Sequence, residues 1–127
     1  MLLLDSQALL WVLSGSTRLG PGARRLVTSS SAVHVSVATI WELTIKDMLG
    51  KVELPADLPG VLDDQGFAIL DITAAHAHGL RAFPELVRHD PFDRLIIAQA
   101  RVSGLRLLTA DRVLLGLDQD FVVDAGR

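Results

Sequence analysis

The chain has 127 residues, half of them hydrophobic, no cysteine and a formal net charge of −3, and its mean hydropathy is +0.38. This length allows one domain with a substantial core, and so apolar a composition excludes an intrinsically disordered chain. The lack of cysteine excludes a disulfide framework and cysteine-rich zinc sites. The acidic balance is not typical of a nucleic-acid binder, although arginines between Arg81 and Arg112 form either a local basic surface or scattered solvated charges.

The N-terminus begins with an apolar run that Asp5 interrupts. No positive residue precedes the run, so it is not typical of a secretory signal peptide. No segment approaches the roughly 18 apolar residues that a membrane span needs. We therefore expect a soluble, cytoplasmic protein with no membrane partner.

The first half of the chain alternates between strand and helix patterns. The predicted elements are a strand over 1–4, a helix over 7–13, a helix over 23–28, a strand over 33–37 and a helix over 39–49. Short apolar runs and alternating valines indicate the strands, and apolar residues at helical spacing indicate the helices. Asp5 or Ser6 would cap the first helix, and Gly50 would end the last.

The second half continues the alternation after a proline-bounded linker. Its predicted elements are a helix over 61–65, a strand over 67–70, helices over 73–80 and 91–103, a strand over 106–108, a short helix after Asp111 and a strand over 121–123. Thr73 is a predicted N-cap, as is Asp90, which precedes a proline. Gly104 is the predicted C-terminal glycine of helix 91–103.

Strands that alternate with helices predict an α/β fold. We expect a three-layer α/β/α sandwich with a mostly parallel central sheet of four or five strands, in a single domain over residues 1–127. Ligands of such sheets bind beyond the carboxyl ends of the strands. Asp5 and Asp111 each follow a strand at that edge.

Each acid near this edge also has a structural interpretation. Asp5 and Asp111 could serve as caps or turn residues, and acids near a helix N-terminus, such as Asp90 and Asp93, are stabilised by the helix dipole. Glu42 could close a capping box with Thr39 and pair with Lys46. Several carboxylates at one edge nevertheless cannot all stay ionised without a cation, because like charges raise each other's pKa. Oxygen ligands favour Mg²⁺ or Mn²⁺ over zinc.

The four histidines do not form an evident site. His76 and His78 would face apart on a helix, which predicts surface positions rather than a zinc site. His34 lies on a predicted strand and His89 beside the Asp90 cap, and neither has an evident serine or acid relay.

Four segments form a recognisable set when taken together. They are Leu-Leu-Leu-Asp5-Ser6, Val35-Ser36-x-Ala-Thr-Ile-Trp41-Glu42, Asp90-Pro-Phe-Asp93-Arg94 and Thr109-Ala-Asp111. In this order, and over nearly the whole chain, they resemble PIN-domain ribonucleases, and most of all VapC-type toxins of bacterial toxin–antitoxin pairs. The resemblance implies a metal-dependent endoribonuclease that hydrolyses RNA, with tRNA or rRNA as substrate, a VapB-type antitoxin as partner and a homodimer as its assembly.

The resemblance also implies roles for individual residues. The implied catalytic acids are Asp5, Glu42, Asp93 and Asp111. Mg²⁺ or Mn²⁺ would be held by Asp5, Asp93 and Glu42, with Asp111 and Asp90 as accessory ligands. Substrate contacts are implied for Ser6, Thr109 and Arg94, although Arg94 could instead pair with Asp90. Gln7 stands where close relatives often have histidine.

Two alternatives remain from other classes of protein. One is a PIN-like protein-binding module without nuclease activity, although the presence of all four core acids argues against a decayed site. The other is a receiver-type phosphoryl-transfer domain, which would need paired acids after the first strand and a late lysine. Here the two lysines, Lys46 and Lys51, come early in the chain.

Overall fold

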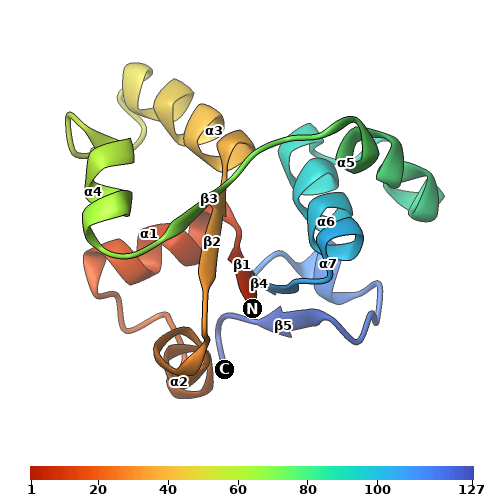
Figure 1. The fold of residues 1–127 in the computed structure, drawn as a ribbon, viewed down its shortest axis with the longest axis horizontal. Coiled ribbons are helices and arrows are strands. Elements are labelled where there is room, and N and C mark those ends of the chain that lie inside the picture. Colours follow the sequence, from red (N-terminus) through yellow and green to blue (C-terminus); the bar gives the residue numbers. More distant parts are fainter.

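A five-stranded parallel sheet forms the centre of the computed structural model, which describes residues 1–127 (Figure 1). The strands are β1 (Leu2–Leu4), β2 (Val33–Ser36), β3 (Ala68–Leu70), β4 (Arg106–Thr109) and β5 (Val122–Asp124). They lie in the order β3-β2-β1-β4-β5, and each neighbouring pair is parallel. The predicted parallel sheet is confirmed, and β1 is its central strand.

Seven α-helices connect the strands. They are α1 (Ser6–Ser14), α2 (Pro21–Ser29), α3 (Val37–Met48), α4 (Leu58–Asp64), α5 (Ala74–His78), α6 (Pro91–Ser103) and α7 (Arg112–Leu115). Two 3₁₀ turns, Gly79–Ala82 and Pro84–Leu86, lie between α5 and α6. The predicted helices are present with ends shifted by a few residues. None of them combines the length and the apolar character that crossing a bilayer would need.

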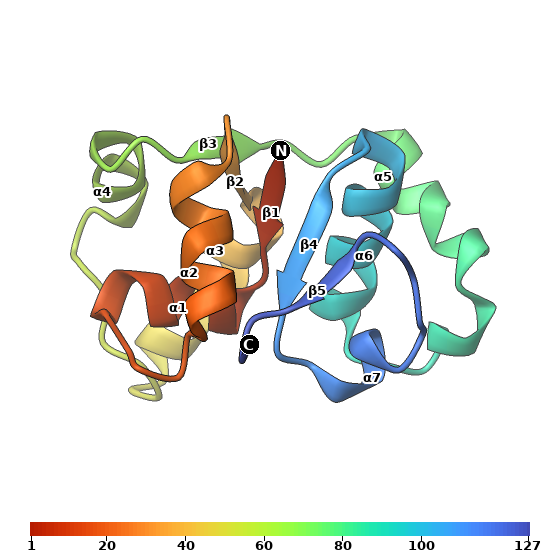
Figure 2. The ribbon, with the colours of Figure 1, turned by 90° about the horizontal axis from the view of Figure 1, so that it is seen from below.

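Apolar side chains bury both faces of the sheet. In β1, Leu2 and Leu4 pack into one hydrophobic cluster with Leu9 of α1, whereas Leu3 packs into a second cluster with Ile97 of α6. None of the three β1 leucines has exposed surface, as expected of a strand covered on both faces. Figure 2 shows α1, α2 and α4 on one side of the strands and α5 and α6 on the other. The predicted three-layer sandwich is therefore confirmed.

Helix α6 has both of the caps that its sequence predicts. The Asp90 carboxylate accepts hydrogen bonds from the backbone N–H groups of Phe92, at 2.9 Å, and Asp93, at 3.1 Å. At the other end, Gly104 has a φ of +66°, the left-handed conformation that glycine adopts without strain. These caps fix where the helix starts, and so they fix where its first-turn side chains point.

Helix α3 begins earlier than its sequence predicts. Its N-cap is Ser36, whose hydroxyl accepts from the backbone N–H of Ala38 at 3.0 Å and donates to the Gln99 side chain of α6. The predicted start at Thr39, and with it the capping box to Glu42, is wrong. The reason is that β2 passes directly into α3, so Thr39 is already inside the helix and fully buried.

The two histidines of α5 have different environments. His78 is exposed, as predicted, but His76 is only 3% exposed, so its predicted surface position is wrong. The His76 ring accepts from the backbone N–H of Thr73 at 3.1 Å through Nδ1, and its Nε2 lies 2.8 Å from the Ser103 hydroxyl. His76 therefore links the start of α5 to the end of α6.

Candidate functional site

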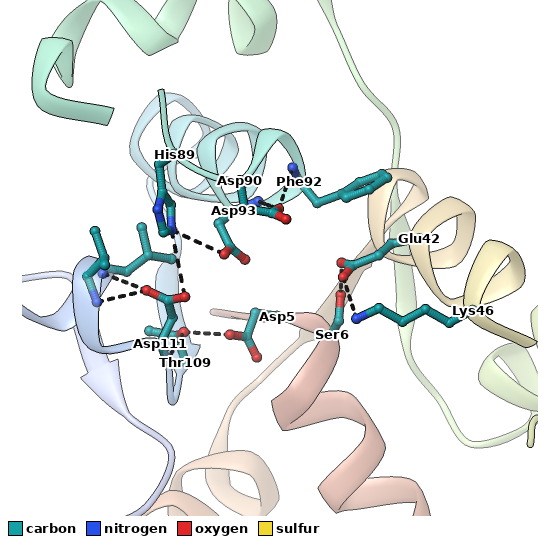
Figure 3. A network of polar contacts seen from close by, with 12 residues as sticks. Asp5, Ser6, Glu42, Lys46, His89, Asp90, Phe92, Asp93, Thr109 and Asp111 are labelled. Carbon is teal, nitrogen blue, oxygen red and sulfur yellow. Dashed lines mark hydrogen bonds and ion pairs between the residues drawn. The ribbon is translucent and has the colours of Figure 1, made fainter. Parts of the chain in front are cut away.

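An acidic cavity of about 350 Å³ lies at the carboxyl ends of β1 and β4. Five carboxylates line it, those of Asp5, Glu42, Asp90, Asp93 and Asp111. They come from the end of β1, from α3, and from the starts of α6 and α7, and Figure 3 shows their side chains directed toward one another. The structure thus brings together all of the acids that the sequence singled out.

Asp5 is both a helix cap and part of the cavity wall. Its Oδ1 accepts from the backbone N–H of Ala8 at 2.8 Å, which caps α1, and its Oδ2 accepts from the Thr109 hydroxyl. The residue is only 5% exposed. Because both oxygens are held, the carboxylate has a fixed direction, and the structural and functional interpretations of Asp5 are compatible.

Thr109 holds two parts of the site in place. Its hydroxyl donates to Asp5 and accepts from the backbone N–H of Asp111 at 3.0 Å. The residue is fully buried. In this structure Thr109 therefore positions Asp5 and the start of α7, whereas its contact with substrate stays a prediction.

Asp93 and Asp111 face each other from the starts of two helices. Asp93 lies in the first turn of α6, directly after the Asp90 cap. Asp111 caps α7 through Oδ1, which accepts from the backbone N–H groups of Val113 at 2.8 Å and Leu114 at 3.0 Å. These contacts leave Oδ2 of Asp111 directed toward Asp93 and the cavity (Figure 3).

His89 joins these two acids, which the sequence alone did not indicate. Its Nε2 lies 3.3 Å from Oδ2 of Asp93 and 3.7 Å from Oδ2 of Asp111. The predicted lack of an acid beside His89 is therefore wrong. A usable signal was the four-residue spacing between His89 and Asp93, but the approach of Asp111 depends on how α6 packs against β4.

Glu42 lies on the opposite side of the cavity. Its Oε1 accepts from the Ser6 hydroxyl, and its Oε2 lies 2.9 Å from Nζ of Lys46. This confirms the predicted pair of Glu42 and Lys46, four residues apart on α3. Ser6 is half-buried and lines the cavity, so its hydroxyl orients Glu42 at the cavity wall.

Arg94 is a predicted site residue whose side chain points away from the cavity. Its guanidinium donates to the carbonyl oxygen of Val87, and the side chain lines a separate surface hollow beside His76 and Leu80. Successive residues of a helix point about 100° apart, so Arg94 turns away when Asp93 faces the cavity. Arg94 forms no ion pair with Asp90, and its contact with a phosphate stays a prediction.

Burial, and then the crowding of the acids, raises the pKa of two carboxyl groups. Burial, and then the negative charge of Asp111 and of Asp90, raise the pKa of Asp93 from 3.8 to about 8. Burial also raises the pKa of Asp5 above its usual value, although its hydrogen bonds from Thr109 and Ala8 oppose the change. These carboxyl groups therefore favour a bound proton, or a cation in its place.

The donor atoms of the cavity fit a divalent cation. Ligand atoms of His89, Asp93 and Asp111 lie within 4.8 Å of one another, with Asp5 and Glu42 lining the same cavity outside this group. Nε2 of His89 is buried and has no hydrogen-bond partner. Carboxylate oxygens suit Mg²⁺ and Mn²⁺, and without cysteine the set does not resemble a structural zinc site.

Comparison with known proteins places this geometry in context. The family profile described as PIN domain matches residues 2–119, whereas no curated protein matches the chain. Among solved structures, VapBC2 from Rickettsia felis bound to a promoter DNA fragment has a TM-score of 0.70 at 15% identity, covering 97% of this chain and 97% of that chain. A toxin–antitoxin complex from Klebsiella pneumoniae has a TM-score of 0.68 at 19% identity, covering 97% and 96%.

A third similar structure is that of a toxin described by what it cleaves. VapC20 from Mycobacterium tuberculosis, described as a sarcin–ricin-loop-cleaving toxin, has a TM-score of 0.56 at 22% identity. The match covers 95% of this chain and 92% of that chain. At these identities the three likenesses establish a shared fold.

Proposed function

This chain belongs to the PIN domain family, and on that premise we propose that it is a Mg²⁺- or Mn²⁺-dependent endoribonuclease and the toxin of a toxin–antitoxin pair. The observation that carries the proposal is the convergence of Asp5, Glu42 and Asp93, together with Asp111, on one cavity. The similar fold of a sarcin–ricin-loop-cleaving toxin and of toxin–antitoxin complexes supports RNA as substrate and an antitoxin as partner.

The acids of the cavity would hold the cation and direct hydrolysis of a phosphodiester. A bound Mg²⁺ or Mn²⁺ supplies positive charge to the phosphate oxygens and lowers the pKa of a bound water. Asp93 and Asp111 offer carboxylates to the ion, and the raised pKa of Asp93 favours exchange of its proton for a cation. Asp5 offers a carboxylate whose direction Thr109 and Ala8 maintain.

Three residues on the Glu42 side of the cavity, Ser6, Glu42 and Lys46, would complete the site. Ser6 and Lys46 hold the two oxygens of Glu42, which keeps this carboxylate directed along the cavity wall. Lys46 also offsets part of the negative charge that an approaching phosphate would meet. Glu42 is suited to bind a second ion or to orient the attacking water, and the hydroxyl of Ser6 to contact RNA.

The exposed apolar face of α3 is our candidate contact surface for a VapB-type antitoxin. Trp41 is 65% exposed and Met48 is 83% exposed, and both line a largely apolar hollow with Ile45. Co-expression with the product of a neighbouring small gene should yield a complex that Trp41→Ser and Met48→Ser weaken.

We also propose that the free protein is a homodimer, and sedimentation of the protein without antitoxin would test this.

The decisive experiment uses purified protein free of antitoxin, incubated with tRNA and with ribosomal RNA. We expect cleavage with Mg²⁺ or Mn²⁺, no cleavage in EDTA, and strong loss of activity in Asp5→Asn and Asp93→Asn. Asp64→Asn is a matched control, because Asp64 is an exposed acid on α4 away from the cavity. Cleavage that persists in EDTA or in Asp5→Asn would refute the mechanism, and a folded protein that cleaves no RNA would favour the binding-module alternative.

A further inference from the structure

His89 places a nitrogen atom beside two acids of the cavity, Asp93 and Asp111, without giving it a hydrogen-bond partner. Nε2 of His89 is buried, although the whole side chain is 21% exposed. A buried polar atom without a partner costs about 1–3 kcal/mol, so its position between two carboxylates needs an explanation. The two carboxylate oxygens nearest to it belong to Asp93 and Asp111.

A simple ion pair does not explain this position well. A charged imidazole bound to a carboxylate donates a hydrogen bond of about 2.7–2.9 Å. Nε2 of His89 instead lies 3.3 Å from Asp93 and 3.7 Å from Asp111, without hydrogen-bond geometry to either. The ring is directed between the two acids rather than at one of them (Figure 3).

The spacing of these atoms matches ligands around one cation. Ligands about 2.1 Å from an octahedral ion lie about 3 Å apart at adjacent positions and about 4 Å apart at opposite positions. The distances from His89 to Asp93 and to Asp111, 3.3 and 3.7 Å, lie between these two values, so the three atoms are close enough to share one cation after small side-chain rotations. We propose that Nε2 of His89 is a direct ligand, beside Asp93 and Asp111, of the cation that the proposed function requires.

The local chain geometry explains why His89 can act in this way. Its backbone N–H donates to the carbonyl oxygen of Leu86 at 2.9 Å, which ties His89 to the preceding 3₁₀ turn. Asp90 caps α6 immediately afterwards and so fixes the direction of Asp93. His89 and Asp93 therefore approach the cavity from a single capped helix start, at a separation that does not depend on a flexible loop.

A nitrogen ligand changes which metal the site prefers. Imidazole binds Mn²⁺, Co²⁺ and Zn²⁺ more readily than Mg²⁺, which prefers oxygen ligands. The site should therefore bind Mn²⁺ more tightly than Mg²⁺, and His89 should account for much of that difference. Loss of the ligand should weaken Mn²⁺ binding on the order of tenfold or more and weaken Mg²⁺ binding less.

The direct test is electron spin-echo envelope modulation of the full chain loaded with Mn²⁺. We expect modulation from a directly bound ¹⁴N nucleus, replaced by a ¹⁵N pattern when the protein is made with ¹⁵N-labelled histidine. The signal should disappear in His89→Ala and persist in His78→Ala, whose histidine is exposed on α5. Mn²⁺-loaded wild-type protein without a bound-nitrogen signal would overturn the proposal, as would a signal that survives in folded His89→Ala.

Calorimetric titration of the metal-free protein provides a second readout. His89→Ala should bind Mn²⁺ more weakly and narrow the preference for Mn²⁺ over Mg²⁺, whereas His78→Ala should match wild type. Unchanged Mn²⁺ affinity in His89→Ala would overturn the proposal. RNA cleavage without a nitrogen signal would refute only the role of His89, and a nitrogen signal without cleavage of any RNA would refute only the nuclease function.

Discussion

Replacement of Asp93 by asparagine should stabilise the metal-free protein at pH 8 and have little effect near pH 4. The pKa of Asp93 in the folded chain is raised from 3.8 to about 8, first by burial and then by the charge of Asp111. Below pH 4 this carboxyl is protonated in both the folded and the unfolded chain. Between pH 4 and pH 8 the unfolded chain loses the proton first, so the wild-type fold loses stability as the pH rises.

The size of the effect follows from the change in pKa. A rise of about four pKa units corresponds to roughly 6 kcal/mol, at about 1.4 kcal/mol per unit. Asp111 and Asp5 share this repulsion, and the Asp93 side chain is 23% exposed, so solvent screens part of it. We therefore expect Asp93→Asn to gain about 1–3 kcal/mol at pH 8 and less than half of that at pH 5.

The assay is urea denaturation followed by circular dichroism, in EDTA, at pH 5 and at pH 8. Asp64→Asn removes an exposed acid and should match wild type at both pH values. Addition of Mn²⁺ should reverse the order at pH 8, because wild type gains stability from the bound ion and Asp93→Asn gains little. The reasoning would be refuted if Asp93→Asn were less stable than wild type at pH 8 in EDTA, or if its effect were equal at both pH values.

Three further substitutions test individual contacts. Thr109→Val leaves a buried oxygen of Asp5 without its hydrogen-bond donor, so we expect the unfolding free energy, measured by urea denaturation, to fall by about 1–3 kcal/mol. Thr109→Ser keeps the hydroxyl and should largely avoid this loss. Equal losses in the two variants would contradict the expectation. Leu9→Ala should cost about 2–5 kcal/mol, because Leu9 is fully buried in the core, and a loss below 1 kcal/mol would contradict the packing. Gly104→Ala should lower the unfolding free energy by about 1 kcal/mol, because alanine is strained at a φ of +66°. No atom lies within 4 Å of the added methyl group, so no steric clash contributes. An unchanged midpoint of urea denaturation would contradict this expectation.

Local patterns in the sequence predicted the elements and several of their ends. Asp90 followed by a proline predicted the start of α6, and Gly104 predicted its end. Glu42 and Lys46 predicted an ion pair on α3. Each of these features depends on a few residues within one or two helical turns, so a single sequence is sufficient to identify it.

Local sequence patterns did not predict helix caps and side-chain burial where residues of a distant element determine them. Thr39 satisfied the rule for a cap, but Ser36 caps α3 because β2 passes directly into the helix, and Gln99 of α6 accepts a hydrogen bond from the same Ser36 hydroxyl. His76 lies on a short helix with polar and small neighbours, yet Ser103 of α6 covers it. Spacing along a helix shows which residues share a face, but not which neighbour that face meets.

The sequence by itself determined the inventory of the site: acids at the ends of strands and starts of helices, no cysteine, and a parallel α/β order. The tertiary structure alone decided how those groups meet. Pairing of β1 with β4 brings Asp5 beside Asp111, and His89, just before the capped start of α6, lies between Asp93 and Asp111 while Arg94 turns outward. The physical reason is that caps and helical spacing act over a few residues, whereas distances between carboxylates on separate elements depend on strand order and core packing.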